Sequence, residues 1–173
     1  DRREAALHGS PPLRSGRPVS STLGVLSPAS MLANHNFWLI VAAVLSGIAA
    51  LLHVAIVFGG APWYRFFGAG ERMASAAEAG RAYPAIVTLG IAIVLALWGA
   101  YALSAAGVLA ALPFLKWCLA AITGVYLLRG LAIIPLLLFA RTQATPFLVW
   151  SSVICIGYGV VHLVGIIEVW SQL

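Results

Sequence analysis

Long runs of apolar residues, separated by short polar stretches, dominate the chain from residue 37 onward. Four of these runs reach the roughly 20 residues that a helix needs to cross about 30 Å of hydrocarbon. We predict membrane spans at about 37–58, 84–106, 113–139 and 147–170. Because backbone groups cannot stay unpaired in lipid, the runs are predicted to be helices. The predicted fold is all-α, an integral membrane four-helix antiparallel bundle.

Prolines mark the limits of these runs. Pro84 and Pro113 open the second and third runs, and Pro146 directly precedes the fourth. Proline is favoured at the first position of a helix, where its missing N–H removes no hydrogen bond. Pro135 lies near the end of the third run, so we expect a kink or fraying of the last turns there.

The connection between the first two spans has a character of its own. Residues 107–112 and 140–145 are short turns, whereas 59–83 is longer. Its alanine-rich part, GERMASAAEAG, predicts a short helix on the membrane surface or over the bundle. Aromatic residues follow the first span as they do in interfacial belts; they are Trp63, Tyr64, Phe66 and Phe67.

Residues 1–30 differ from the rest of the chain. They are rich in proline, serine, glycine and arginine and show no sustained apolar period. We predict a disordered tail there and a four-span domain over 31–173. The first methionine, Met31, opens MLANHNFWLIV, which is typical of a natural start. The tail is therefore a non-native extension, a native cytoplasmic tail or a targeting segment; it lacks the apolar stretch of a secretory signal.

The composition excludes several classes of protein. The 173 residues are 62% hydrophobic and 9% charged, whereas a soluble domain has about 45–50% apolar and about 25% charged residues. This excludes a conventional soluble enzyme, a nucleic-acid-binding domain and a disordered chain. The net charge of +5 comes mainly from the tail and the loops. Basic residues at such positions set the orientation of a membrane protein. The expected partner is the lipid bilayer, and no nucleic acid is expected.

Basic residues near the spans predict the orientation. The loops 59–83 and 140–145 hold arginines, whereas Lys116 alone stands near the spans on the opposite side if the tail is discounted. Both loops are therefore predicted to be cytoplasmic, with both termini outside. The tail arginines weaken this orientation if the tail is native. The loop arginines are Arg65, Arg72, Arg81 and Arg141.

Small residues at four-residue spacing predict close helix contacts. We take packing within one chain as their main use, with contacts to a second copy or another membrane protein as the alternative. Cys118 and Cys155 are interpreted as small packing residues, so neither a disulfide nor a metal site is expected. The stripes are Ala43 with Gly47, Ala120 with Gly124, and Ser151 with Cys155 and Gly159.

Two stretches carry a resemblance to known proteins. GGAPWYRFFGAGERMASAAEAG after the first span, and LPFLKWCLAAITGVYLLRGL in the third, resemble a group of small bacterial four-span membrane proteins with a Gly-Ala-Pro-x-Tyr-Arg-x-Phe-Gly-Ala-Gly-Glu-like loop. The resemblance covers Phe37 to the C-terminus and implies the bacterial inner membrane. The group has no assigned activity, so it implies no catalytic residue. The layout is also similar to that of DoxX-type proteins, in architecture only.

Ionisable residues inside spans are expensive and are candidates for function. Arg129 lies roughly 4 Å past the centre of the third span, and His53 lies at a similar depth. They are predicted to line a cytoplasm-facing pocket with Glu71 or Glu78, and with Tyr126 as a hydrogen-bonding neighbour. Such a pocket would hold an anionic headgroup or a small anion. The alternative, which we favour, is an arginine that extends to the interface and pins the loop through an ion pair.

The remaining polar residues have structural interpretations. His53 and His162 are candidate haem ligands, but their depths differ by about 14 Å, more than one iron spans. We therefore predict no cofactor, and interpret His162 and Tyr158 as hydrogen-bonding groups between helices. Lys116 and Glu168 lie near the outer interface, where they either pair or, as we favour, set the span ends.

Three functions are consistent with the sequence. We favour a non-enzymatic structural or interaction component of the membrane, because the spans hold few polar groups. The alternative is a carrier that binds a small molecule, anion or lipid at Arg129 and His53. The third is a haem- or quinone-binding redox protein using His53 and His162. The chain lacks paired acids at one depth, a nucleophile with a base, and the broken helix pairs of many transporters.

Overall fold

A computed structural model describes residues 35–173, so the predicted tail at 1–30 lies outside the described residues. Within the described range every regular element is a helix. Four segments are long and apolar enough to cross a membrane, as predicted: Phe37–Phe66, Tyr83–Ala105, Leu115–Phe139 and Pro146–Val169. The elements are α2 (Phe37–Phe66), α3 (Glu71–Glu78), α4 (Tyr83–Ala105), α5 (Leu115–Leu131), α6 (Ile133–Phe139), the 3-10 turn η1 (Arg141–Gln143) and α7 (Pro146–Val169).

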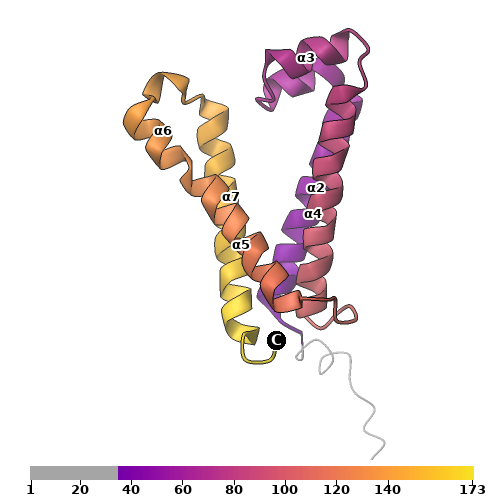
Figure 1. Ribbon diagram of the computed structural model, residues 1–173, viewed down its shortest axis with the longest axis vertical. Coiled ribbons are helices and arrows are strands. Elements are labelled where there is room, and N and C mark those ends of the chain that lie inside the picture. Colours follow the sequence, from indigo (N-terminus) through magenta and orange to yellow (C-terminus); the bar gives the residue numbers. More distant parts are fainter. Residues whose placement is uncertain (1–34) are drawn as a thin grey trace, which may run out of the picture.

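The helices form two arms arranged as a V (Figure 1). The first arm consists of α2 and α4 side by side, with α3 lying across their end. The second arm consists of α5 and α7, with α6 and η1 at its tip. The arms meet near the C-terminus and diverge toward α3 and α6, and we call the diverging side the open end. The chain thus forms two helix pairs that lie closest together near the C-terminus rather than one evenly packed bundle.

An aromatic cluster joins the arms where they meet. The Ser46 hydroxyl of α2 and the Tyr126 hydroxyl of α5 are 3.1 Å apart and hydrogen-bonded. The Tyr126 ring also contacts Trp98 of α4, with ring centroids 5.0 Å apart, and Tyr158 and His162 of α7, at 5.5 and 5.1 Å. Each aromatic pair contributes about 0.5–1.5 kcal/mol beyond its buried area. Tyr126 therefore connects helices of both arms.

Glycines bring α5 and α7 together within the second arm. A methyl group added at Gly130 or Gly159 would come within 3.1 Å of backbone atoms of the facing helix. The predicted contact at Gly159 is therefore confirmed.

In the first arm, a methyl group added at Gly99 of α4 would lie 3.3 Å from the Ala43 carbonyl oxygen and 3.9 Å from the Gly47 nitrogen, so the predicted contact at Ala43 and Gly47 is also confirmed. At Gly124 an added methyl would meet nothing within 4 Å, so this position was wrongly predicted to be a site of close approach.

Two of the long segments are broken toward the open end. In α2, Gly60 has the non-helical angles φ 64° and ψ −153°, and Pro62 follows it. In the third span, α5 ends at Leu131 and α6 begins at Ile133. Pro135 lacks the N–H that would bond the Leu131 carbonyl, which confirms the predicted kink. The break at Gly60 lies just past the end of the predicted span 37–58 and was not predicted.

The helix starts agree with two of the three proline predictions. Pro84 lies in the first turn of α4 and Pro146 is the first residue of α7, where the Thr145 side chain accepts a bond from the Leu148 N–H at 3.2 Å. Pro113 instead lies before α5, which begins at Leu115. A proline fixes the dihedral angle of its own residue but does not determine on which residue the helix starts.

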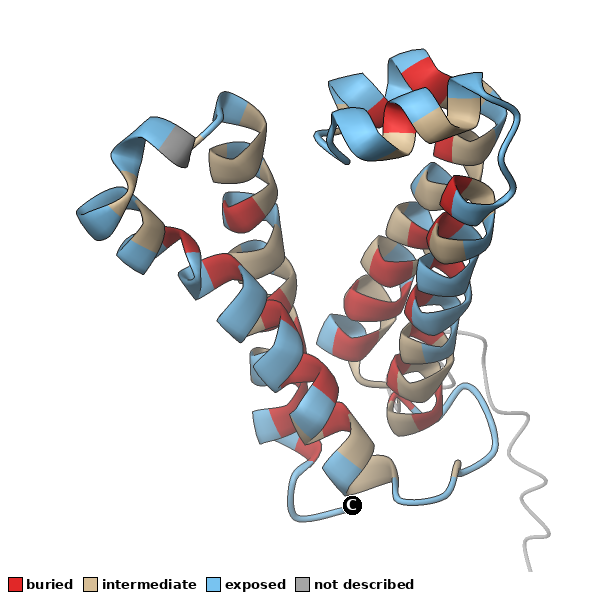
Figure 2. Cartoon of the chain, turned by 45° about the horizontal axis from the view of Figure 1, so that its top comes forward, coloured by how far each residue is buried: buried red, intermediate tan, exposed pale blue. Residues whose placement is uncertain are grey.

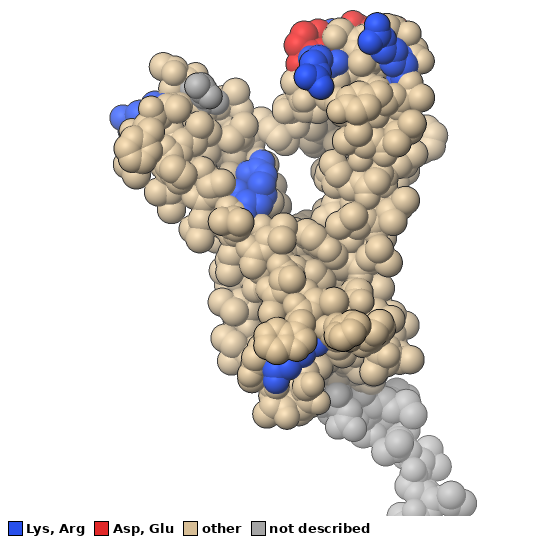
Figure 3. All heavy atoms as spheres, viewed as in Figure 1, with Lys and Arg blue, Asp and Glu red and all other residues tan. Residues whose placement is uncertain are grey.

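The outer surfaces of the helices are apolar. Buried residues follow the seams within each arm, while much of the remaining helix surface is exposed (Figure 2). Charged side chains gather toward the ends of the molecule, with a largely uncharged region between them (Figure 3). Soluble proteins rarely expose so large an apolar surface. Such surfaces suit contact with lipid chains, in agreement with a multi-pass membrane protein.

Candidate functional site

A cavity of about 460 Å³ lies between the arms on the side of the open end. Its walls come from α2, the 67–69 turn, α3 and α4 of the first arm and from α5 and α7 of the second arm. Figure 3 shows the opening between the arms, with a basic side chain at its edge. Most of the lining is apolar. The lining residues with polar or thiol groups are His53, Tyr64, Thr88, Arg129, Ser151 and Cys155.

The structure places Arg129 and His53 in the walls of this one cavity. The Arg129 guanidinium donates hydrogen bonds to the Ser152 and Ser151 hydroxyls of α7, each at 3.3 Å. No ion pair within residues 35–173 includes Arg129. Arg129 lies inside the third apolar segment. Its charge is therefore stabilised by neutral hydroxyl groups of α7 at the cavity wall.

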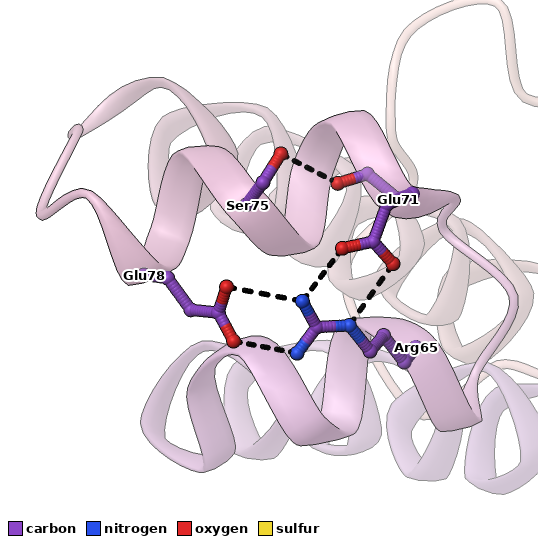
Figure 4. Close-up of polar contacts among 4 residues, drawn as sticks. All are labelled: Arg65, Glu71, Ser75 and Glu78. Atoms are coloured by element: carbon purple, nitrogen blue, oxygen red, sulfur yellow. Dashed lines mark hydrogen bonds and ion pairs between the residues drawn. The ribbon is translucent and has the colours of Figure 1, made fainter.

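The two glutamates predicted for this pocket bind Arg65 instead (Figure 4). The Arg65 guanidinium donates to both carboxylate oxygens of Glu71, at 2.6 and 3.0 Å, and to both of Glu78, also at 2.6 and 3.0 Å. The glutamates are seven residues apart on α3, about two turns, and so share a face. The loop-pinning ion pair that the sequence assigned to Arg129 is made by Arg65.

This ion-pair cluster fixes α3 over the end of α2. Hydrogen bonds from Arg65 hold the pKa of the Glu71 and Glu78 carboxyls below their usual range, so both are ionised at neutral pH. Ala74 of α3 is fully buried in a cluster with Ile56 of α2. The first arm is therefore closed at the open end by a helix held through charge and apolar contacts.

Tyr64 is a residue of the cavity wall whose burial the sequence did not predict. Tyr64 is only 2% exposed, and its buried hydroxyl has no hydrogen-bond partner among the described residues. Leaving such a group unsatisfied costs about 1–3 kcal/mol. The interfacial-belt prediction holds for the exposure of Trp63 and Phe66, at 41% and 75%, but it is wrong for Tyr64. The break at Gly60 lies between Tyr64 and the span, so the helical period of the span does not predict its direction.

A second contact between the arms lies beside the cavity. The Phe147 ring of α7 meets the Phe67 ring at a centroid distance of 6.2 Å and an interplanar angle of 84°. A methyl group at Gly68 would lie 2.4 Å from the Phe147 ring. Gly68 has a positive φ of 64°, which glycine adopts without strain. The arms therefore touch at the Tyr126 cluster and again at Phe147, and residues of this second contact line the cavity.

The two histidines occupy different environments. The Nδ1 of His53 donates to the Ala49 carbonyl at 2.7 Å, and His53 lines the cavity. His162 is fully buried beside Tyr126, and its Nδ1 donates to the Tyr158 carbonyl at 2.9 Å. Each Nδ1 bond goes to the carbonyl four residues back on the same helix. The described residues contain no cluster of three or more His, Cys, Asp or Glu side chains placed to hold a metal ion.

Lys116 and Glu168 bind other groups rather than each other. The Lys116 ammonium donates to the Trp170 carbonyl at 3.2 Å and lies 4.2 Å from the centre of the Trp170 ring. The Glu168 carboxylate accepts a bond from the Asn36 amide at 2.7 Å. Asn36 also caps α2 by accepting from the Leu39 N–H at 2.8 Å. These contacts hold the ends of α2, α5 and α7 together.

No protein-family model matches the chain, and comparisons with curated proteins and with solved structures likewise give no match. The chemistry of the cavity is therefore the main source of a functional hypothesis. Arg129 supplies a positive charge, and most of the remaining wall is apolar. Such a site suits a molecule with one anionic end and one apolar end.

Proposed function

We propose that this multi-pass membrane protein binds an anionic amphiphile in the cavity between its arms and performs no chemical conversion. The observation that supports this is the Arg129 guanidinium, inside an apolar segment and held in the described structure by two serine hydroxyls. A carboxylate or phosphate headgroup would pair with Arg129. An apolar chain would contact the rest of the wall.

The energetics favour such a ligand. A charge inside the membrane is expensive unless a partner or water reaches it. Guanidinium groups match carboxylate and phosphate geometry with two parallel hydrogen bonds. Ile56 and Ile91 give apolar surface on the first arm, and the Ser151 hydroxyl lies in the wall beside Arg129. A volume of about 460 Å³ lies within the usual range of about 300–1,000 Å³ for ligand sites.

We further propose an orientation for the chain. The open end holds most of the charged side chains of the described residues, and the basic loops 59–83 and 140–145 belong to it. The positive-inside rule then places the open end in the cytoplasm and both termini outside, with the spans crossing in alternate directions. The resemblance to bacterial four-span proteins favours the inner membrane. In this orientation the cavity is on the cytoplasmic side.

A structural or interaction component remains the second candidate, because small-residue positions face outward. Gly124 is exposed, and an added methyl there would meet no atom within 4 Å. Together with Ala120 it offers a close-approach surface for a second copy or another membrane protein. The redox function is the least supported of the three, because His53 and His162 lie in different environments.

Native mass spectrometry of the protein released gently from its own membrane tests the proposal. We expect wild-type protein to retain an adduct of lipid-like mass, Arg129→Gln to lose it, and Arg141→Gln to keep it. Arg141 lies at the tip of the same arm outside the cavity lining. Accumulation of each variant in the membrane controls for folding.

Two results would contradict the proposal: a bare wild-type protein, or an adduct that Arg129→Gln retains in full. If Arg129→Gln fails to accumulate, Arg129→Lys replaces it, because this change keeps the positive charge but loses the two parallel hydrogen bonds that a guanidinium can donate. It is expected to weaken retention without disturbing the fold. The same spectra give the stoichiometry, and a homo-oligomer without adduct would favour the structural function.

A further inference from the structure

A second site lies on the face of α3 that α2 does not cover. A groove of about 610 Å³ opens there at the turn between α3 and α4. Both of its charged lining residues are arginines. The lining residues are Arg72, Ser75, Ala76, Ala79, Arg81 and Tyr83.

The end of α3 positions Arg81 in this groove. Gly80 adopts a positive φ of 68°, its N–H bonds the Ala77 carbonyl at 3.0 Å, and the Arg81 N–H bonds the Ala76 carbonyl at 2.9 Å. This pair of bonds is the Schellman arrangement, which favours glycine at the left-handed position. Because Ala76 is one helical turn after Arg72, the motif brings Arg81 to the groove that Arg72 lines.

The charges around the groove are segregated. The two glutamates of α3 bind Arg65 with both of their carboxylate oxygens. No acidic residue lines the groove. Two guanidinium groups thus share a concave surface without a carboxylate in its lining. Guanidinium groups are donors only, and they pair best with phosphate or carboxylate oxygens.

The groove also lies at the end of a candidate membrane span. Tyr83 is the first residue of the second membrane-spanning segment, and tyrosines are enriched where spans meet lipid headgroups. We propose that this groove binds the phosphate group of an anionic phospholipid headgroup. The site is separate from the cavity of Arg129 and does not depend on the function proposed for that cavity.

Lipid titration by native mass spectrometry tests this inference on the full chain in mild detergent. The probe is phosphatidylglycerol, with zwitterionic phosphatidylcholine as the reference lipid. Near a membrane surface each arginine strengthens binding of anionic lipid about fivefold, so the Arg72→Gln/Arg81→Gln variant should bind phosphatidylglycerol about thirtyfold more weakly. Arg141→Gln is the matched control and should bind it as wild type does. Repeating the titration in an Arg129→Gln background removes the cavity site from the measurement.

A Gly80→Ala variant separates geometry from net charge. It keeps both arginines but strains the left-handed position that places Arg81, so it should also weaken binding of phosphatidylglycerol. Equal binding by wild type and the double variant would overturn the proposal. An equal loss in Arg141→Gln would also overturn it, since the effect would then be net charge alone.

Hydrogen exchange distinguishes the source of the phosphate. Amides of α3 and of the turn through Tyr83 should be protected when phosphatidylglycerol is added. If inorganic phosphate gives no protection, the ligand is the lipid headgroup, as proposed. Protection by inorganic phosphate alone would overturn the lipid assignment.

Discussion

Arg65 on the first arm and Arg129 on the second arm carry the same charged group in opposite surroundings. Arg65 stands at the open end of α2 and binds two carboxylates through four hydrogen bonds. Arg129 lies inside an apolar segment and binds two serine hydroxyls at 3.3 Å. The first arginine is neutralised by its own chain. The second retains a charge that a ligand can meet.

The arms differ in the same way around these residues. In the first arm, α3 covers the end of the helix pair, with Ala74 buried on α2 and Arg65 bound to both of its glutamates. In the second arm, the short helix α6 continues outward from the break and Phe139 at its end is 88% exposed. The end of the first arm is thus covered by a helix. The second arm places the charged Arg129 at the cavity between the arms.

The largest effect, a loss of folding stability, is expected from forcing apart α5 and α7, the helices of the second arm. A methyl group at Gly130 would lie 2.9 Å from the Ile156 nitrogen and 3.0 Å from the Ser152 carbonyl oxygen. Gly130→Val should therefore destabilise the protein by about 1–3 kcal/mol through overpacking. Thermal unfolding in detergent measures this. Gly124→Val is the control and should cost much less, because a Cβ added there meets no atom within 4 Å; equal losses in both variants would contradict the packing described.

The next largest effect, a wider separation of the arms, is expected from removing their second contact. Phe147→Ala deletes the ring that touches Phe67 and Gly68, so the arms should separate more widely at the open end. Distances between spin labels at Ala79 and Leu138 should lengthen and broaden. Phe139→Ala, which removes an exposed ring of the same arm, should leave them unchanged. Unaltered distances in Phe147→Ala would show that the contact does not hold the arms.

A smaller effect, on hydrogen exchange in α3, distinguishes Arg65 from Arg129 directly. Arg65→Gln removes the cation that α3 binds, so the α3 amides should exchange hydrogen several times faster, as expected for loss of an exposed bidentate cluster. Arg129→Gln should leave α3 exchange as in wild type. Faster α3 exchange in Arg129→Gln would mean that the two sites are coupled, contrary to the separate roles described.

Acid should loosen α3 in the same way but to the smallest extent. The folded-state pKa values of Glu71 and Glu78 are lowered by Arg65, so their stabilisation is complete above the ordinary carboxyl value of about 4.3 and is lost as the pH falls through the lowered values. A spin label at Ala79 should become more mobile over that acidic range. In Arg65→Gln this transition should be absent; an unchanged transition would assign it to other groups.

The sequence predicted those features that depend on length and local chemistry. The four apolar segments, a short helix within 70–80 and the break before Pro135 all follow from run length, alanine content and the missing proline N–H. The placement of Arg129 and His53 in one cavity follows from their similar depth. Depth can be estimated because each helical residue rises by about 1.5 Å.

The arrangement of the arms and the direction of individual side chains did not follow from the sequence. Lipid and a neighbouring helix are both apolar, so hydrophobic periodicity does not mark which face of a span is packed. The outward direction of Gly124 could not be predicted for this reason. The inward direction of Tyr64 could not be predicted because the break at Gly60 interrupts the helical period. The pairing of Glu71 and Glu78 with Arg65 depends on how α3 turns back over α2, and glycines at 68 and 70 with positive φ determine that path.

The most direct test of the cavity uses the two cysteines as an internal pair. Cys155 lines the cavity and Cys118 does not. Delipidated wild-type protein is alkylated with N-ethylmaleimide with and without oleate, an anionic amphiphile, or oleyl alcohol, its neutral counterpart. We predict that oleate slows alkylation of Cys155 relative to Cys118 in wild type but not in Arg129→Gln, and that oleyl alcohol protects neither. Equal protection by the two ligands, or protection that survives Arg129→Gln, would contradict an anion site at Arg129.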